Sequence, residues 1–181
     1  MAVCPEHIGI NMNLERDRCT ACGKCVDACP RGARTRMVRL CDTDEIRSQI
    51  RRHEIFYRYS GGGITFSGGE ATAQPAFLND LTAQIYDMNI SMALESCGHF
   101  AFDSVRASLE RFDLIFMDLK MMDDDKHKLY TGASNAVTLE NIKKLAEVPA
   151  DVVIRIPVIG GVNNDEENIR CSAAYVHANL P

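Results

Sequence analysis

Residues 113–120 read DLIFMDLK, in which four consecutive apolar residues are followed by the polar pair Asp118 and Lys120. A short, strongly apolar run that ends in polar residues predicts a buried β-strand. Three other segments have the same character, and we predict a strand in each of them: residues 63–69, 90–96 and 151–159. The larger part of the chain is therefore built around four predicted strands.

The segments between these strands repeat apolar residues at helical spacing. Residues 42–59 begin at a cap, Asp42 or Thr43, and residues 74–89 carry Pro75 in their first turn. Strands that alternate with helices predict an α/β fold, with a parallel sheet and helices on its outside, as a barrel or an open sheet. A further strand would ordinarily follow the last helix, so we expect an incomplete barrel. The other predicted helices cover residues 101–112, 138–148 and 165–180.

Composition separates a short first part of the chain from the rest. Residues 1–40 are rich in Cys, Arg and turn-forming residues, whereas residues 41–181 show the regular pattern. We predict these two ranges as the domains. The net charge of −5 argues against nucleic acid as the main partner, because such sites need a basic surface. There is no run of 18 apolar residues and no secretion signal in the first ten residues, so we expect a cytoplasmic protein without a membrane anchor.

The cysteine run Cys19-x2-Cys22-x2-Cys25-x3-Cys29-Pro30 has the spacing of a ferredoxin-type [4Fe–4S] site. Structural zinc usually binds two well-separated pairs of ligands, which this run lacks. Cluster binding needs reduced thiolates, which fits a cytosolic protein. We therefore predict that residues 1–40 form part of a ferredoxin-like iron–sulfur module.

Cys4-Pro5 resembles the end of a second run of the same kind. In two-cluster ferredoxins, the fourth cysteine of each run binds the other cluster. On that assignment Cys4, Cys19, Cys22 and Cys25 bind one cluster, and Cys29 has no partners within this chain. In the alternative assignment, Cys29 completes the cluster and Cys4 is incidental.

Polar residues gather where the predicted strands end. Gly68-Gly69-Glu70 follow the first strand, Glu95 and Ser96 close the second, and the third ends in Asp118 and Lys120. In parallel α/β folds, ligands bind at the carboxyl ends of the strands. The glycines allow close approach of a ligand to the main chain, and a carboxylate can accept an ammonium group. The glycine-rich stretch lacks the Gly-Lys-Ser/Thr of a phosphate-binding loop.

The sequence as a whole resembles the radical S-adenosylmethionine activases of glycyl-radical enzymes, the family of pyruvate formate-lyase activating enzyme. The resemblance rests on YSGGGITFSGGEATAQPAFL, ALESCGHF, LIFMDLKMMDDDKHKLYTGASNAVTLENIKKL and VVIRIPVIGGVNND, in this order across residues 43–170. It implies part of a (β/α)6 TIM-like radical SAM barrel. The cysteine run resembles the subgroup that carries a ferredoxin-like insert.

The resemblance also implies roles for residues at the strand ends. Gly68, Gly69 and Glu70 match the motif that holds the methionyl amino group of S-adenosylmethionine. Lys120 matches a residue close to this cosubstrate, and we take it as the catalytic candidate. Arg155 lies on a strand that lines the same barrel.

Other positions match a site for a monovalent cation and a motif of unassigned role. Glu95, Ser96 and Asp118, with the Phe116 carbonyl, correspond to the place where some members bind the cation beside the methionyl carboxylate. Glu95 stands where the family has Asp. His127 belongs to a motif of the family, and for it we expect a role as a helix or loop anchor.

The implied reaction is a reductive cleavage of S-adenosylmethionine. The resulting 5′-deoxyadenosyl radical takes hydrogen from a glycine of a partner glycyl-radical enzyme, in anaerobic metabolism, and the electron comes from a donor such as flavodoxin or ferredoxin. The family's C-x3-C-x2-C run is absent from these 181 residues. We therefore expect a piece of a longer activase that is inactive by itself. The alternative is a ferredoxin-like electron-transfer or binding fragment without catalysis.

Overall fold

The structure is a computed structural model that describes residues 3–8, 16–36 and 38–180. The chain divides into two compact units, Met1–Cys41 and Asp42–Pro181. None of the helices in the described ranges is long and apolar enough to span a membrane.

The described residues of the unit Met1–Cys41, which are 3–8, 16–36 and 38–41, contain two short elements. These are the 3-10 helix η2 (Arg16–Arg18) and one turn of helix, α1 (Lys24–Asp27). Gly23 precedes α1 in the left-handed conformation, with φ of 81°. A Cβ atom on Gly23 would lie 2.2 Å from Nη2 of Arg36, so a larger residue cannot enter without moving that side chain.

The unit Asp42–Pro181 contains a four-stranded parallel sheet with strand order β1-β2-β3-β4. Each strand pairs in parallel with the next strand along the chain. This topology confirms the predicted α/β fold with a parallel sheet. The strands are β1 (Gly63–Phe66), β2 (Ser91–Ser96), β3 (Leu114–Asp118) and β4 (Asp151–Arg155).

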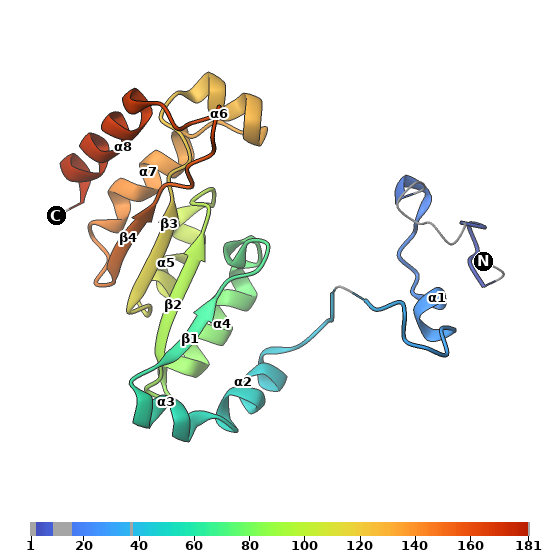
Figure 1. Cartoon of the computed structure of the whole chain (residues 1–181). Coiled ribbons are helices and arrows are strands. Elements are labelled where there is room, and N and C mark those ends of the chain that lie inside the picture. Colours follow the sequence, from blue (N-terminus) through green and yellow to red (C-terminus); the bar gives the residue numbers. More distant parts are fainter. Residues whose placement is uncertain (1–2, 9–15, 37, 181) are drawn as a thin grey trace. The chain divides into compact units, whose positions relative to one another are not determined.

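Helices follow the strands and cover one face of the sheet. α4, α5 and α7 lie against this face (Figure 1), and Leu94, Ile115 and Met117 are fully buried beneath them. Side chains alternate between the two faces of a strand, so the intervening residues lie on the opposite face. The helices of this unit are α2 (Thr43–Arg51), α3 (Glu54–Ser60), η3 (Ala71–Ala73), α4 (Pro75–Tyr86), α5 (Phe102–Leu109), α6 (Asp124–Thr131), α7 (Ala136–Leu145) and α8 (Glu166–Asn179).

The predicted helix over residues 42–59 forms as two helices, α2 and α3. Asp42 is the N-cap of α2, as predicted, and its carboxylate accepts a hydrogen bond from the Glu45 N–H at 2.7 Å. The main chain changes direction at His53, whose N–H donates to the Ile50 carbonyl in a tighter turn. The prediction of one continuous helix is therefore wrong at this point.

All four strands are shorter than the ranges predicted for them, and helix α6 was not predicted. β4 ends at Arg155, whereas the predicted strand extends to Ile159. The difference arises because Pro157 has no N–H to donate to a neighbouring strand. β3 ends at Asp118, and the Leu119 N–H just beyond it still donates to the Arg155 carbonyl of β4 at 2.9 Å. α6 escaped prediction because its sequence is polar, with His127 as its buried residue.

Candidate functional site

The charged residues predicted at the strand ends meet on the face of the sheet opposite the helices. Glu95 lies in β2, Asp118 at the end of β3 and Arg155 at the end of β4, and each is partly buried. Asp118 and Arg155 are direct neighbours in the β3–β4 register. Lys120 follows two residues after Asp118.

These four side chains form one connected group of ion pairs. Arg155 donates from Nε to Oδ1 of Asp118 at 3.1 Å and from Nη1 to Oε1 of Glu95 at 2.9 Å, and its Nη2 atom lies 3.1 Å from Oδ1 of Asp118. Lys120 Nζ lies 2.9 Å from Oδ2 of Asp118. The Ser67 hydroxyl donates to Oε2 of Glu95 at 2.9 Å. Partial burial opposes ionisation of Arg155, but Asp118 and Glu95 outweigh it and raise its pKa.

Glu70 forms a second cluster beside this group. Its Oε1 atom accepts hydrogen bonds from the hydroxyls of Thr72 and Ser96, at 2.8 and 2.9 Å, and from the Thr72 N–H. Its Oε2 atom accepts from the Cys97 N–H at 2.9 Å. Burial raises the pKa of Glu70, but the hydrogen bonds from Cys97 and Thr72 outweigh this effect, so the pKa lies below its usual range. Glu70 is therefore held in the ionised form.

The two glycines before Glu70 leave space for a ligand. Gly68 has φ of 111°, which a residue with a side chain rarely adopts. No protein atom lies within 4 Å of a Cβ built at Gly68 or at Gly69. The main chain beside Glu70 is thus open on the side where a Cβ would stand.

Ser96 belongs with Glu70 rather than with the charged group of Glu95 and Asp118. It is 4% exposed, points to the helix-covered face, and links Oε1 of Glu70 to the Gly98 N–H, which donates to its hydroxyl at 3.0 Å. Neighbouring residues of a strand point to opposite faces, which separates Ser96 from Glu95. Ser96 therefore helps to orient Glu70.

Three buried asparagines hold the loops that follow the strands, and the sequence analysis missed them. Asn141 donates to the carbonyls of Gly98 and Phe100, at 2.9 and 2.8 Å, and so fixes the loop after β2. Asn135 donates to Met121 and Met122, and Asn163 donates to Lys120 and Pro157. These three side chains are each at most 3% exposed. Burial of a polar side chain would have identified them, but burial cannot be read from the sequence.

His127 acts as an anchor for the loop after α6, as expected. It is 8% exposed, and its Nδ1 atom lies 2.7 Å from the Ala133 carbonyl and 3.1 Å from the Thr131 hydroxyl. The short distance to a carbonyl oxygen places the proton on Nδ1. His127 thus ties the start of the loop after α6 to the helix itself.

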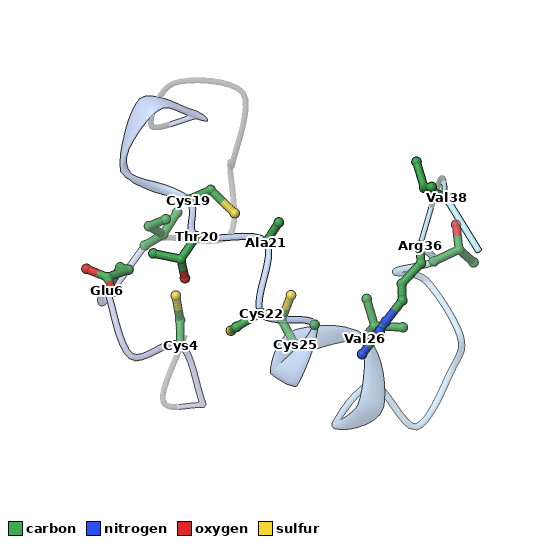
Figure 2. A pocket seen from close by; sticks show the side chains of 13 residues that line it. Cys4, Glu6, Cys19, Thr20, Ala21, Cys22, Cys25, Val26, Arg36 and Val38 are labelled. Atoms are coloured by element: carbon green, nitrogen blue, oxygen red, sulfur yellow. The ribbon is translucent and has the colours of Figure 1, made fainter. Parts of the chain in front are cut away.

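The Met1–Cys41 unit contains a cavity of about 390 Å³ lined by Cys4, Cys19, Cys22 and Cys25. Figure 2 shows these four cysteine side chains around the cavity, with Arg36 and Val38 on its other side. Among the residues that the structure describes, no three Cys, His, Asp or Glu side chains come close enough to hold a single metal ion. Thiols spread around a cavity suit a polynuclear cluster, whose irons are each reached by one cysteine.

Cys29, also a described residue, is not part of the cavity wall. Its thiol accepts hydrogen bonds from the main chain at Arg31 and Ala33, and these lower its pKa, assisted by the charge of Arg34. Of the two assignments that the sequence left open, this geometry favours the one in which Cys4 binds together with Cys19, Cys22 and Cys25.

The geometry of both units agrees with the comparison to known protein families. The model of the radical SAM superfamily matches residues 18–170. The chain belongs to this superfamily. The matched range includes the four cysteines of the Cys19–Cys29 run and all four strands of the sheet.

Relatives place this radical SAM chain among the activating enzymes of glycyl-radical enzymes, as the resemblance predicted. It is 38% identical over 165 residues to the isethionate sulfite-lyase activating enzyme of Oleidesulfovibrio alaskensis, covering 90% of this chain and 53% of the relative. It is 40% identical over 122 residues to the trans-4-hydroxy-L-proline dehydratase activating enzyme of Clostridioides difficile, covering 67% of this chain and 40% of the relative. The chain therefore spans about half the length of these curated relatives.

Solved structures support the same family and fold. A domain of pyruvate-formate lyase-activating enzyme from Bacteroides vulgatus is 37% identical, with a TM-score of 0.60, over 66% of this chain and 74% of that domain. Streptococcus suis SuiB bound to S-adenosylmethionine is 13% identical, with a TM-score of 0.63, over 80% of this chain and 33% of SuiB. The second likeness concerns the fold alone.

Proposed function

We propose that this chain supplies the cosubstrate-binding part of a glycyl-radical enzyme activase. The observation that carries the proposal is that two groups lie at the carboxyl ends of the strands: Glu70, held by the Cys97 N–H, and the ion-paired group of Glu95, Asp118, Lys120 and Arg155. In the reaction of this family, one-electron cleavage of S-adenosylmethionine yields a radical that removes hydrogen from a glycine of the partner enzyme.

Three of these charged residues, Glu70, Lys120 and Arg155, can bind the methionyl group directly. Glu70 is held ionised by its donors and can accept the amino group, to which the open main chain at Gly68 and Gly69 gives access. Lys120 and Arg155 present N–H donors that can bind the methionyl carboxylate. Because Lys120 and Arg155 are also bound to Asp118, their positions are fixed before the cosubstrate arrives.

The cysteine-lined cavity fits a [4Fe–4S] cluster held by Cys4, Cys19, Cys22 and Cys25. When bound, such a cluster supplies single electrons at low potential. The chain contributes thiol ligands and the apolar side chains of Ile8, Val26 and Val38 in the wall of the cavity. Thiol ligands of this kind require a reducing compartment, so we place the protein in the cytoplasm of an anaerobic cell.

Two protein partners follow from this activity. The first is a glycyl-radical enzyme, since the relatives are named for activating a sulfite-lyase and a dehydratase. The second is a one-electron donor of the flavodoxin or ferredoxin type. A monovalent cation between Glu95 and Asp118, the remaining component that the resemblance implies, agrees poorly with the ion pairs that occupy both carboxylates.

Binding of the cosubstrate can be tested by NMR under anaerobic conditions after cluster reconstitution. We expect titration with S-adenosylmethionine to shift the amide signals of Gly68, Gly69 and Cys97. Glu70→Ala should remove these shifts, whereas Glu110→Ala, at the exposed end of α5, should preserve them. Absence of any shift in the wild type contradicts the proposal.

Cleavage is a separate question, because no three cysteines of this chain have the C-x3-C-x2-C spacing. We expect residues 1–181 alone to form no 5′-deoxyadenosine from S-adenosylmethionine under strong reductant. Reproducible formation of 5′-deoxyadenosine by this chain contradicts that expectation.

A second candidate function is electron transfer without catalysis. It is favoured by the separation of Met1–Cys41 as a compact unit with its own cysteine-lined cavity. This candidate predicts a reversible low-potential cluster signal in electron paramagnetic resonance, with no response of the Gly68 and Gly69 amides to S-adenosylmethionine. The NMR titration therefore separates the two functions.

A further inference from the structure

Glu95 and Asp118 form a pair of carboxylates whose four oxygen atoms all have donors within the protein. Glu95 receives the Arg155 Nη1 group on Oε1 and the Ser67 hydroxyl on Oε2. Asp118 receives Arg155 on Oδ1 and Lys120 on Oδ2. Two carboxylates and two cations give this group a formal charge of zero.

Arg155 reaches both carboxylates because its side chain crosses a strand. Asp118 is its direct neighbour in the β3–β4 register, but Glu95 lies on β2, one strand further away. Adjacent strands are about 4.8 Å apart, so the guanidinium group must pass over β3 to reach β2. It does so above the ring of Phe116, with Cζ 5.3 Å from the ring centroid. Phe116 is also the register partner of Glu95.

A monovalent metal ion does not fit this donor set. Such an ion binds oxygen atoms directly and needs uncompensated negative charge, whereas here both carboxylates are already paired with the cationic groups of Arg155 and Lys120. An ion placed between Glu95 and Asp118 would lie beside the guanidinium group, and like charges at a few ångströms repel. The resident cation of this site is the side chain of Arg155.

We propose that Arg155 takes the place of a bound monovalent cation, so that the site works independently of sodium and potassium. The proposal deepens the proposed function, because Arg155 then presents a fixed positive charge to the methionyl carboxylate. A guanidinium group has five N–H donors, and three nitrogen atoms are used toward Glu95 and Asp118. Two N–H groups remain beyond these contacts for a ligand carboxylate.

The length of Glu95 is part of this arrangement. Glutamate extends one methylene further than aspartate, and Oε1 of Glu95 meets Nη1 of Arg155 at 2.9 Å. Glu95→Asp withdraws the carboxylate from the guanidinium group, which stays paired with Asp118, so the charge of the shortened residue is no longer neutralised by Arg155. We therefore expect Glu95→Asp to convert the site into one that binds a monovalent cation. Arg155→Met, which removes the charge and keeps an unbranched chain, should have the same effect.

Thermal unfolding in sodium chloride, potassium chloride or choline chloride at equal ionic strength tests this inference. We expect the wild type to unfold at the same midpoint in all three salts. Glu95→Asp and Arg155→Met should unfold roughly 2–4 °C higher in sodium or potassium chloride than in choline chloride. Glu110→Asp, an exposed acidic residue at the end of α5, is the matched control and should show no such difference.

Sodium-23 NMR on the wild type gives a second measurement that does not depend on the variants folding. We expect the sodium line width to be the same with the wild type as with Glu110→Asp at equal concentration, and broader with Glu95→Asp. The inference is overturned if sodium or potassium chloride stabilises the wild type more than choline chloride does. It is also overturned if the wild type broadens the sodium line and Asp118→Asn removes that broadening. Neither measurement uses S-adenosylmethionine, so failure of the proposed function would be seen separately, in the NMR titration with the cosubstrate.

Discussion

The main-chain N–H of Cys97 donates a 2.9 Å hydrogen bond to Oε2 of Glu70. The residue after β2 thereby fixes the carboxylate that follows β1. This contact joins two adjacent loops at the carboxyl edge of the sheet, so the geometry of the candidate binding site depends on the pairing of β1 with β2.

The charge of Glu70 should contribute to stability in a pH-dependent way. Its pKa is lowered in the folded state, so the contribution is complete above the ordinary glutamate pKa of about 4.3 and is lost as the pH falls through the lower folded value. We expect Glu70→Gln to reduce the free energy of unfolding by about 1 kcal/mol at pH 7, after allowance for partial exposure. Denaturant unfolding of both proteins from pH 7 to pH 3 measures this difference, which should shrink toward low pH. A difference that does not change with pH contradicts the assignment.

The cysteine assignment can be tested by iron content. Because Cys4 lines the cavity with Cys19, Cys22 and Cys25, we expect Cys4→Ala to lose most of its iron and its visible absorbance after reconstitution. Cys29→Ala should retain the iron bound by the other four cysteines. Cys171→Ala, an exposed cysteine of α8, serves as the control for a lost thiol. Loss of iron in Cys29→Ala alone would support the other assignment.

Asp124 should stabilise the α6–α7 connection at neutral pH. Its carboxylate accepts from Lys128 at 2.6 Å, the Ser134 hydroxyl at 2.7 Å and the Asn135 N–H at 2.9 Å. The ion pair with Lys128, followed by these hydrogen bonds, lowers its pKa to about 2. The stabilising effect is therefore present above an ordinary aspartate pKa of about 3.9 and is lost as the pH falls toward 2.

We expect Asp124→Asn to lower the midpoint of thermal unfolding at pH 7 and to converge with the wild type near pH 2. Asp125→Asn is the matched control, since the Asp125 side chain is 99% exposed and lies 3.8 Å from Lys128. Equal effects of the two substitutions at pH 7 would show that Asp124 contributes nothing beyond surface charge.

Loss of the Asn141 amide should destabilise the loop after β2. Asn141→Ala leaves the buried carbonyls of Gly98 and Phe100 without their donor, at a cost of roughly 1–3 kcal/mol. Glu140 is the exposed residue next to Asn141, and Glu140→Ala is the control variant. Denaturant unfolding measures both, and hydrogen exchange of the 97–100 amides should rise in Asn141→Ala alone. Unchanged exchange at these amides would contradict an anchoring role.

The sheet and the charged strand ends could be predicted because both depend on local sequence patterns. The four apolar runs each form a strand, and parallel strands place their carboxyl ends at one edge, which brings Glu95 and Asp118 together. The reach of Arg155 over Phe116 to Glu95 could not be predicted, since it depends on register and on the path of a long side chain.

The elements that escaped prediction have little apolar periodicity or bury polar side chains. α6 carries charged residues over most of its length and was therefore not identified as a helix. Asn141 lies in a predicted helix, where a polar residue is normally expected to face water, yet it is 2% exposed. Its burial follows from the carbonyls of Gly98 and Phe100, which become neighbours only when the chain has folded.

The contact between Arg155 and Glu95 joins residues that are 60 positions apart in the chain. Contacts between such distant residues form late in folding, because a long loop must close before they can meet. Until β4 pairs with β3, Glu95 and Asp118 lack the guanidinium group, and only Lys120 partly offsets their charge. The strand that completes the described sheet therefore also brings the charge that relieves the repulsion between these carboxylates. A folding intermediate without β4 should be recognisable by a greater sensitivity to salt than the native protein shows.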